Sequence, residues 1–268
     1  MLENPRSPRV RAVAKLSKRS ARSETGLFLL EGPQSVREAL RYLPEAIVEL
    51  FATPTTWEKH PDVRDLATEV DIEVEYVTED VLSAMADTVT PQGLVAVARQ
   101  TPTSVRDIFA ASPRLIAICE EVRDPGNLGT IIRAADASGA DAVVLTGRTV
   151  DPYNPKVVRS TTGSLFHLPI SVGGDLTDVI TRAHAAGLQV IAADVKGDDL
   201  LAARADGVLG RPTAWLFGNE ARGLEEDALV QVDRALKLPI FGRAESLNLA
   251  TAASVCLYES AFSQRATG

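Results

Sequence analysis

Apolar residues in the second half of the chain occur either as short continuous runs or at helical spacing. The run at 115–119 predicts a buried strand, whereas Ile131, Ile132 and Ala135 follow the spacing of an amphipathic helix. The same patterns predict strands at 115–119, 142–146, 189–195, 213–217 and 235–238, and helices at 128–138, 155–162, 176–186, 225–231 and 247–260. Because strands alternate with helices here, we expect an α/β domain with a mostly parallel sheet.

The first hundred residues show shorter elements of the same two kinds. A helix is expected to begin at Pro33. Strands are predicted at 28–32, 48–52, 72–77 and 94–98, which indicates a small α/β domain of its own. Residues 101–104 combine proline with small polar residues, as is typical of a linker. We therefore predict a basic arm at 1–23, a small α/β domain at 24–100 and a larger domain at 105–268.

Length and composition are those of an ordinary globular protein. The 268 residues are enough for two domains, and 45% are hydrophobic and 24% charged. No apolar run approaches the roughly 18 to 20 residues of a membrane span, and the N-terminus lacks the apolar core of a signal peptide. Cys119 and Cys256 have apolar neighbours and no metal-binding spacing. We therefore expect a cytoplasmic location, buried free thiols, no metal and no membrane contact.

The charge is unevenly distributed along the chain. The net charge is −8, but residues 1–22 contain seven cationic residues against one acidic residue, a net of +6, so the remainder carries −14. A basic arm on an acidic body is suited to contacting the phosphates of a nucleic acid. A solvated tail or a basic helix face would explain the same residues without such a partner.

A run of turn and helix residues follows the predicted strand 115–119. Pro125, Gly126 and Gly129 open a turn, and Asn127 is expected at the N-cap of the next helix. Arg133 comes six residues later, about 9 Å along a helix axis. Because helical side chains lean toward the N-terminus, we expect Arg133 to point inward and to reach the level of Asn127. A helix start with these two side chains suits an anionic or polar ligand.

Two further polar segments follow predicted elements. Gly218, Asn219 and Glu220 come directly after the strand 213–217, where parallel sheets place their ligands, although a surface turn explains such a tripeptide equally well. Ser246 and Asn248 begin the last predicted helix, in which no charged residue occurs until position 259. Helix capping explains these two residues, and capping can coexist with a site because a helix N-terminus has free amide donors.

Several motifs of nucleotide-binding proteins and serine hydrolases are absent from the sequence. No G-x-G occurs, which argues against an ordinary Rossmann methyltransferase or dehydrogenase. Neither G-x-S-x-G nor G-x-x-x-x-G-K-[ST] occurs. The three polar segments therefore do not belong to any of the sites that these motifs define.

In this order, the three segments resemble the motifs of the SpoU (TrmH) family of RNA ribose methyltransferases, in the SPOUT superfamily. The resemblance spans roughly residues 24–262 and is most specific from 120 to 250. It implies a catalytic domain with a deep trefoil knot, an N-terminal SpoU substrate-binding domain and a homodimer formed through the knotted domains. Ala221 departs from the family, which usually has glycine after the second-motif glutamate, so this turn is expected to differ in detail.

The resemblance also implies a cofactor and residue roles. S-adenosyl-L-methionine is expected to bind in the knot. The expected cofactor-binding residues are Gly218, Leu238, Ile240 and Leu247 through backbone groups, with Leu216 and Leu249 lining the adenine pocket. The expected catalytic residues are Arg133, Asn127, Glu220, Ser246 and Asn248. A guanidinium is a poor base, so electrostatic stabilisation of the attacking ribose oxygen is the role expected of Arg133.

The sequence therefore predicts an enzyme that methylates a ribose 2′-oxygen in RNA. Ribosomal 23S RNA is favoured as the substrate because the resemblance includes the N-terminal domain, which small family members acting on transfer RNA tend to lack. A transfer RNA 2′-O-methyltransferase and a non-catalytic RNA-binding protein of the same fold remain alternatives. A small-molecule α/β enzyme is a third alternative, against which the basic arm counts.

Overall fold

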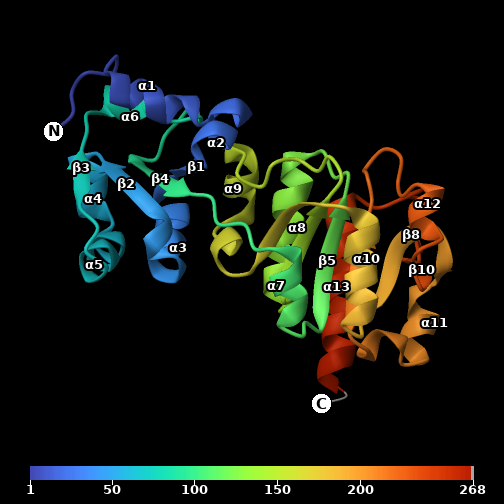
Figure 1. Ribbon diagram of the computed structural model, residues 1–268. Helices are drawn as coiled ribbons and strands as arrows, with labels where there is room; N and C mark the ends of the chain where they lie inside the picture. Colours follow the sequence, from blue (N-terminus) through green and yellow to red (C-terminus); the bar gives the residue numbers. More distant parts are fainter. Residues whose placement is uncertain (267–268) are drawn as a thin grey trace. The chain divides into compact units, whose positions relative to one another are not determined.

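The computed structural model describes residues 1–266, and the chain forms two compact units (Figure 1). The first unit contains residues 1–101 and 151–167, and the second contains residues 102–150 and the chain from residue 168 onward. The boundaries predicted for the arm and the two domains remain predictions, and the last two residues of the predicted larger domain lie outside the described residues. The first unit thus includes a segment that lies between two stretches of the second.

The first unit contains a four-stranded sheet in the order β1-β4-β2-β3, in which only β2 and β3 run parallel. Its strands are β1 (Leu27–Glu31), β2 (Ile47–Ala52), β3 (Val74–Tyr76) and β4 (Leu94–Arg99). Its helices are α1 (Pro8–Lys15), α2 (Arg19–Thr25), α3 (Gly32–Tyr42), α4 (Pro54–Lys59), α5 (Pro61–Glu69), α6 (Glu79–Met85) and α9 (Pro155–Thr161), with short 3₁₀ turns at Pro44–Ala46 and Ser164–Phe166. The four strands predicted from the sequence are all present, within a few residues.

Helix α1 is part of the core of the first unit. Val10 and Val13 are buried on one side of the helix and pack with Phe51 of β2. Arg11 and Lys15 lie one turn apart on the exposed side. The predicted basic arm therefore consists in large part of packed helices, whose apolar side covers the sheet and whose cations, apart from Arg22, face solvent.

Arg22 differs from the other cations of this segment because it is buried. Its side chain is 2% exposed and forms an ion pair with Asp151, with a nitrogen–oxygen distance of 2.7 Å. Its guanidinium also donates hydrogen bonds to the backbone carbonyls of Leu16 and Ser17, at 2.9 and 2.8 Å. All its polar contacts are therefore internal, and Arg22 cannot contact a nucleic acid.

Replacing Arg22 with methionine is expected to lower the free energy of unfolding of the first unit by about 3 kcal/mol, because Asp151 and two carbonyls lose their buried partner. Urea denaturation followed by circular dichroism measures this change. Arg9→Met is the control, since the Arg9 side chain is 47% exposed and its ion pairs with Glu49 and Glu75 should contribute less than about 1 kcal/mol. Equal losses in the two variants would contradict the prediction.

The second unit contains a six-stranded sheet in the order β10-β8-β9-β5-β6-β7, and every pairing in it is parallel. Its strands are β5 (Leu115–Glu120), β6 (Ala142–Thr146), β7 (Ile170–Gly174), β8 (Gln189–Asp199), β9 (Thr213–Phe217) and β10 (Arg234–Lys237). Its helices are α7 (Val105–Ala110), α8 (Pro125–Ser138), α10 (Leu176–Ala185), α11 (Leu200–Ala205), α12 (Glu226–Leu229) and α13 (Leu249–Ala266), with a 3₁₀ turn at Val208–Gly210.

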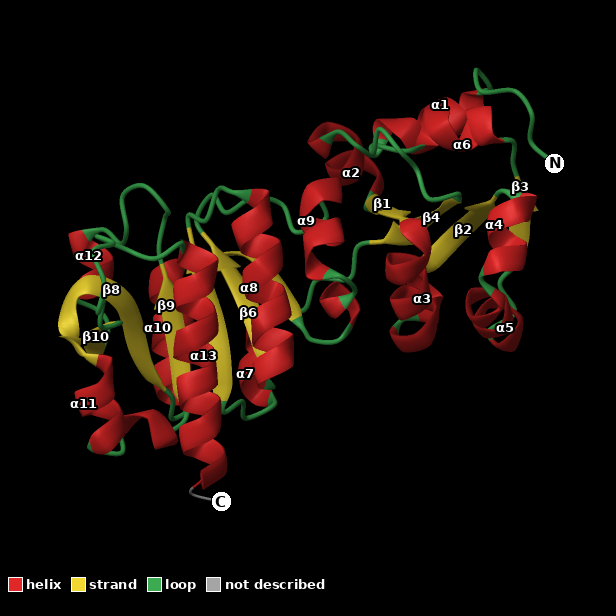
Figure 2. Ribbon diagram, turned by 180° about the vertical axis from the view of Figure 1, so that it is seen from behind, coloured by secondary structure: helices red, strands yellow, loops and turns green. Residues whose placement is uncertain are grey.

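Helices cover both faces of this sheet. Residues of α7, α10 and α12 share one core with Ile116 and Ile118 of β5. Trp215 of β9 points to the opposite face, where its indole N–H donates a hydrogen bond of 2.9 Å to the hydroxyl of Ser260 in α13. Helix α13 packs against α8 on that second face (Figure 2). The continuous apolar strands of the sequence are therefore buried on both sides, as parallel sheets require.

The expected α/β class with a mostly parallel sheet is confirmed, and the five strands predicted for this unit are all present. The sequence patterns missed the edge strand β7 and the short helices α7 and α11. The deep trefoil knot stays a prediction. Across residues 1–266, no helix is both long enough and apolar enough to cross a membrane.

Candidate active site

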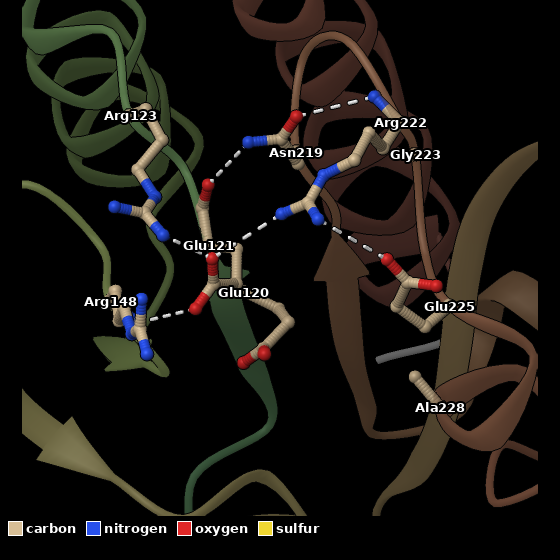
Figure 3. A pocket seen from close by; sticks show the side chains of 9 residues that line it. All are labelled: Glu120, Glu121, Arg123, Arg148, Asn219, Arg222, Gly223, Glu225 and Ala228. Carbon is tan, nitrogen blue, oxygen red and sulfur yellow. Dashed lines mark hydrogen bonds and ion pairs between the residues drawn. The ribbon is translucent and has the colours of Figure 1, made fainter.

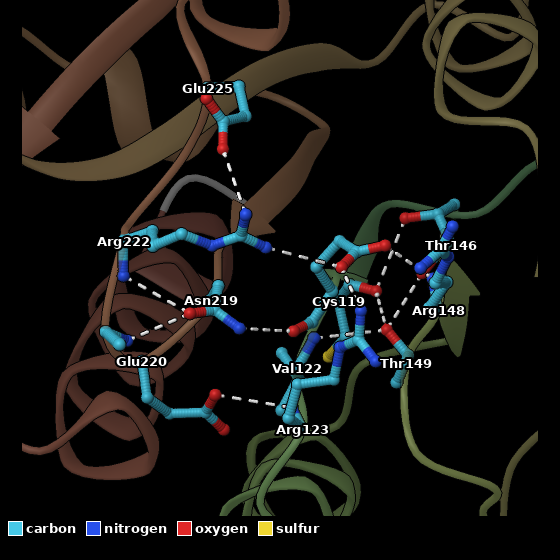
Figure 4. Close-up of polar contacts among 12 residues, drawn as sticks. Cys119, Val122, Arg123, Thr146, Arg148, Thr149, Asn219, Glu220, Arg222 and Glu225 are labelled. Atoms are coloured by element: carbon cyan, nitrogen blue, oxygen red, sulfur yellow. Dashed lines mark hydrogen bonds and ion pairs between the residues drawn. The ribbon is translucent and has the colours of Figure 1, made fainter.

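Glu220 connects the second polar segment to the first. One carboxylate oxygen accepts hydrogen bonds from the backbone N–H of Asp124 at 3.1 Å and from the side-chain amide of Asn127 at 3.3 Å. The other oxygen accepts a hydrogen bond of 3.2 Å from the backbone N–H of Arg123, and Figure 4 shows this carboxylate facing Arg123. The acid thereby fixes the loop that leads from β5 into α8.

Asn248 connects the third segment to the first. Its side-chain amide donates a hydrogen bond of 2.9 Å to the side-chain oxygen of Asn127. Its own side-chain oxygen accepts hydrogen bonds from the backbone N–H groups of Ala250 and Thr251, at 2.9 and 3.2 Å, which caps α13. Asn248 therefore combines capping with a site contact, and a chain of hydrogen bonds runs from Asn248 through Asn127 to Glu220.

The start of α8 differs from the prediction. Asp124, not Asn127, is the N-cap residue, and its carboxylate accepts a hydrogen bond of 2.8 Å from the backbone N–H of Asn127. Pro125 occupies the first helical position, where a missing N–H costs nothing. Because Asp124 satisfies the cap, the side chain of Asn127 is left to bridge Glu220 and Asn248.

Two of the predicted catalytic residues stand apart from this chain of hydrogen bonds. Arg133 is exposed on α8, and within residues 1–266 its guanidinium has no hydrogen-bond or ion-pair partner. The prediction that it points inward is wrong, because Ile131, Ile132 and Ala135 occupy the buried positions around it. Six residues also turn a helix by about 600°, which is about 120° short of two full turns, so Arg133 and Asn127 lie on different sides of α8. Ser246 is likewise exposed, in the loop before α13.

The second segment forms a tight turn that is fixed by Asn219. Its side-chain amide donates a hydrogen bond of 2.8 Å to the backbone carbonyl of Glu121, which joins the ends of β9 and β5. Asn219 and Gly223 exchange two backbone hydrogen bonds, of 3.0 and 2.8 Å, across the turn. Gly223 has a φ of +69°, whereas Ala221 does not have a positive φ. Alanine in place of glycine at position 221 is therefore tolerated. The sequence interpretation missed this role of Asn219, although its place between Gly218 and Glu220 was a signal.

The residues predicted to bind the cofactor lie on three segments at the same edge of the sheet. Gly218 follows β9 and is buried, Leu238 and Ile240 follow β10, and Leu247 lies in the loop before α13. Ile240 and Leu247 are 38% and 41% exposed. Leu216, in contrast, is fully buried within the core of the sheet. Leu249 is the first residue of α13 and is half-buried.

The segment between β10 and α13 has the features of a site for an adenosine-containing cofactor. Across the described residues 238–247, no backbone group makes a hydrogen bond to other backbone, so N–H and carbonyl groups are available. The partly exposed apolar side chains of Leu238, Ile240 and Leu247 lie among these groups. An adenine ring needs apolar contacts along its faces and a few backbone hydrogen bonds at its edge. The assignment of individual cofactor-binding residues stays a prediction.

A cavity of about 380 Å³ lies beside the turn at Asn219 (Figure 3). Its lining residues are Glu120, Glu121, Arg123, Arg148, Asn219, Arg222, Gly223, Glu225 and Ala228. Burial raises the pKa of the Glu120 carboxyl, whereas the hydrogen bond from Arg123 lowers the pKa of Glu121. None of the predicted cofactor-binding residues is among its lining residues.

The two cysteines do not take part in this chemistry. Cys119 and Cys256 are free thiols and are buried, as predicted. Burial raises the pKa of each to about 12, so neither is a thiolate near neutral pH. Across residues 1–266, no group of three or more histidine, cysteine or acidic side chains could hold a metal ion.

Fold and site together define an α/β protein whose ligand site lies at the carboxyl edge of a parallel sheet. The profile of the "SpoU rRNA Methylase family" matches residues 114–258, and that of the "MRM3-like substrate binding domain" matches residues 7–96. The chain therefore belongs to the SpoU family of RNA ribose methyltransferases, as the three motifs predicted.

Similarity to individual proteins supports the assignment to this family. The chain is 35% identical over 257 residues to a 23S rRNA (guanosine(2553)-2′-O)-methyltransferase of Bacillus subtilis, covering 96% of this chain and 97% of that protein. It is 32% identical over 262 residues to a 23S rRNA (uridine(2479)-2′-O)-methyltransferase of Streptomyces viridochromogenes, covering 95% and 89%. The crystal structure of an AdoMet-bound rRNA methyltransferase from Sinorhizobium meliloti superimposes with a TM-score of 0.81 at 32% identity, covering 97% and 96% of the two chains.

Proposed function

We propose that this protein transfers a methyl group from S-adenosyl-L-methionine to a ribose 2′-oxygen of 23S ribosomal RNA. The observation that carries the proposal is the chain of hydrogen bonds from Asn248 through Asn127 to Glu220, which joins the three family motifs at one edge of the sheet. Two relatives that match nearly the whole chain are named as 23S rRNA 2′-O-methyltransferases, and the domain matched at residues 7–96 is a substrate-binding domain. A transfer RNA substrate is the alternative within the same chemistry.

The reaction is a direct displacement in which the ribose oxygen attacks the methyl carbon and the carbon–sulfur bond breaks. When bound, S-adenosyl-L-methionine supplies the electrophilic methyl group. Glu220 is held by backbone donors of residues 123 and 124, so its role is to fix the α8 loop and to place Asn127. Among residues 1–266 the guanidinium of Arg133 has no hydrogen-bond or ion-pair partner, and its role is to stabilise the negative charge that develops on the ribose oxygen. Asn127, Ser246 and Asn248 orient the ribose and the cofactor loop.

The exposed cations of the first unit suit the RNA partner. Arg11, Lys15 and Lys18 are exposed on or just after α1. Side chains four residues apart lie on one side of a helix, so Arg11 and Lys15 form a pair of cations on one side of α1 that suits a phosphate backbone, and Lys18 follows three residues later. Buried free cysteines and a ribosomal RNA substrate support a cytoplasmic location, which is part of this proposal.

The test is transfer of a labelled methyl group to purified 23S ribosomal RNA, transfer RNA and assembled large ribosomal subunits. Nuclease digestion and mass spectrometry should find the label on a 2′-O-methylated nucleoside from 23S ribosomal RNA. Label in transfer RNA alone would replace the ribosomal substrate with the alternative. Cofactor binding without transfer to any of the three RNAs would contradict the proposed activity and favour a non-catalytic RNA-binding protein.

A homodimer is part of the proposal, and one surface of the second unit fits it. Val255, Tyr258 and Phe262 of α13 are 39%, 36% and 54% exposed and recur at the spacing of one helix side. The hydroxyl of Tyr258 donates a hydrogen bond of 3.2 Å to the carbonyl of Ala137 in α8, so this apolar side of α13 adjoins the exposed side of α8. Arg133 lies one turn before Ala137, which would place it at the contact between two copies.

Replacing Phe262 with glutamate is expected to weaken the dimer roughly thirtyfold or more, because a charge would be buried in an apolar contact. Sedimentation analysis over a range of protein concentrations measures the dissociation constant. Val230→Glu is the control, since Val230 follows α12 and is 76% exposed. A dimer of unchanged strength in the Phe262 variant would rule out this surface as the contact.

A further inference from the structure

Three arginines converge on one edge of the sheet in the second unit. Arg123, Arg148 and Arg222 lie in the loops that follow β5, β6 and β9, which are neighbours in the sheet. Because these strands are parallel, the three loops emerge at the same edge. Figure 3 shows the three arginines around the cavity, with Glu121 between them.

Glu121 is the inner member of this cluster. Its carboxylate accepts a hydrogen bond from the guanidinium of Arg123 and one of 2.8 Å from the backbone N–H of Arg148, and a guanidinium nitrogen of Arg222 lies 3.6 Å away. The Glu121 side chain is 23% exposed, whereas Arg123 and Arg222 are 48% and 62% exposed. The guanidinium groups therefore face solvent while one acid neutralises them from within.

The backbone at Glu121 is held in an unfavourable conformation. Its φ is +56°, in the left-handed region that residues with a side chain seldom adopt. The hydrogen bond from Asn219 to the Glu121 carbonyl, at 2.8 Å, fixes this conformation. Strain of this kind persists where the surroundings enforce it, and it is concentrated at functional sites. Here it places a carboxylate beside the guanidinium groups of Arg123 and Arg222 and within hydrogen-bond distance of the backbone N–H of Arg148.

The other acids of the cavity hold the arginines only weakly. Glu225 is 77% exposed, and among the described residues its carboxylate pairs only with Arg222, at 3.7 Å. Burial raises the pKa of Glu120, which disfavours its charged form. If the side chain of Glu121 turned away, the three guanidinium groups would therefore present a concentrated positive charge. The described lining contains no aromatic side chain on which a base could stack, so the chemistry favours a phosphate over a nucleobase.

We propose that Arg123, Arg148 and Arg222 form a binding site for a backbone phosphate of the substrate RNA, and that Glu121 occupies this site as an internal counter-ion in the free protein. A phosphate of the RNA replaces the carboxylate, and its oxygens accept the hydrogen bonds that the guanidinium groups donate. Because each phosphate must displace Glu121, a polyanion that lacks the other contacts of the substrate binds weakly. The inference rests on the proposed function, since it assumes an RNA substrate.

The test uses the full-length protein with cofactor present and an in vitro transcript of bacterial 23S ribosomal RNA. Glu121→Gln keeps the shape of the side chain and removes its charge, and we expect the dissociation constant for RNA to fall about fivefold. Arg222→Gln is expected to weaken binding about fivefold and to reduce the slope of log K against log salt concentration by about 0.7 to 0.9, the contribution of one phosphate contact. Fluorescence anisotropy at several salt concentrations measures both quantities.

Glu225→Gln is the matched control, because it removes a carboxylate from the same cavity that only Arg222 approaches. Its affinity for RNA should stay within about twofold of the original protein. In the double variant that combines Glu121→Gln with Arg222→Gln, the gain in RNA affinity caused by Glu121→Gln should be smaller than in the single variant, as expected for residues that share one ligand. The inference would be overturned if Glu121→Gln left the affinity for RNA unchanged, or if Glu225→Gln raised that affinity by the same factor as Glu121→Gln.

The RNA-binding measurements do not depend on methyl transfer, so the phosphate site and the proposed activity are tested separately. If Glu121→Gln tightens RNA binding but no RNA is methylated, the phosphate site stands and the proposed activity fails. If 23S ribosomal RNA is methylated but the Glu121 and Arg222 variants bind RNA as the original protein does, the proposed activity stands and the phosphate site fails.

Discussion

Replacing Arg133 with alanine is expected to reduce methyl transfer to RNA by at least about a hundredfold and to leave cofactor affinity unchanged. Arg133 has no hydrogen-bond or ion-pair partner among the described residues, so its removal breaks no contact that stabilises the fold. The loss of activity would then report the missing stabilisation of the ribose oxygen. Initial rates with saturating cofactor and RNA measure the effect on transfer, and calorimetric titration with S-adenosyl-homocysteine measures cofactor affinity.

Arg133→Lys and Arg106→Ala separate the possible causes of such a loss. Lysine keeps the charge but not the planar guanidinium, so a partial recovery would show that charge contributes. Arg106 is an exposed arginine of α7, on the opposite face of the sheet, and its replacement should leave transfer unchanged. Full turnover by the Arg133→Ala variant would remove Arg133 from the catalytic residues.

The strands that the sequence predicted best are those buried on both sides. Residues 115–119 and 214–217 are continuously apolar because helices cover both faces of the sheet, and no helical spacing competes with that pattern. The edge strand β7 was missed because it ends in Gly173 and Gly174, which resemble a loop, and only Ile170 and Ser171 are buried. An edge strand needs fewer apolar residues, so its pattern is weaker.

The candidate site was predicted in part. The order of the motifs placed Asn127, Glu220 and Asn248 in one site, and the structure connects them. The hydrogen bond between Asn127 and Asn248 joins residues 121 positions apart, which no local spacing could specify. The cap at Asp124 was predictable, because proline at the next position is a known helix-start signal. The exposure of Arg133 was also predictable from its place between buried neighbours on α8.

Long-range packing accounts for another part that the sequence could not specify. Residues 151–167 follow β6 of the second unit, yet they belong to the first. Asp151 pairs with Arg22, 129 positions earlier, and helix α9 lies against β1. Local patterns predicted the helix at 155–162 correctly but contained no information on which sheet it packs against.

Gly218 shows how a single missing side chain shapes the site, and its replacement with alanine is expected to have a large effect. A Cβ atom at this position would lie 2.7 Å from the backbone carbonyl atoms of Gly223 and from Leu224 Cγ. The turn would have to move outward, which would break the two hydrogen bonds between Asn219 and Gly223. Overpacking of this kind costs about 1 to 3 kcal/mol of stability.

Because Gly218 is an expected cofactor-binding residue and Glu220 lies within the displaced turn, Gly218→Ala should also weaken cofactor binding at least about tenfold and methyl transfer about a hundredfold. Gly242→Ala is the matched control, since a Cβ atom there would have no neighbour within 4 Å and the residue does not have a positive φ. Calorimetric titration with S-adenosyl-homocysteine, together with urea denaturation, separates lost binding from lost stability. A Gly218→Ala variant that binds the cofactor as tightly as the Gly242→Ala variant would show that the turn can relax, and the close packing of Gly218 would then be unnecessary for the site.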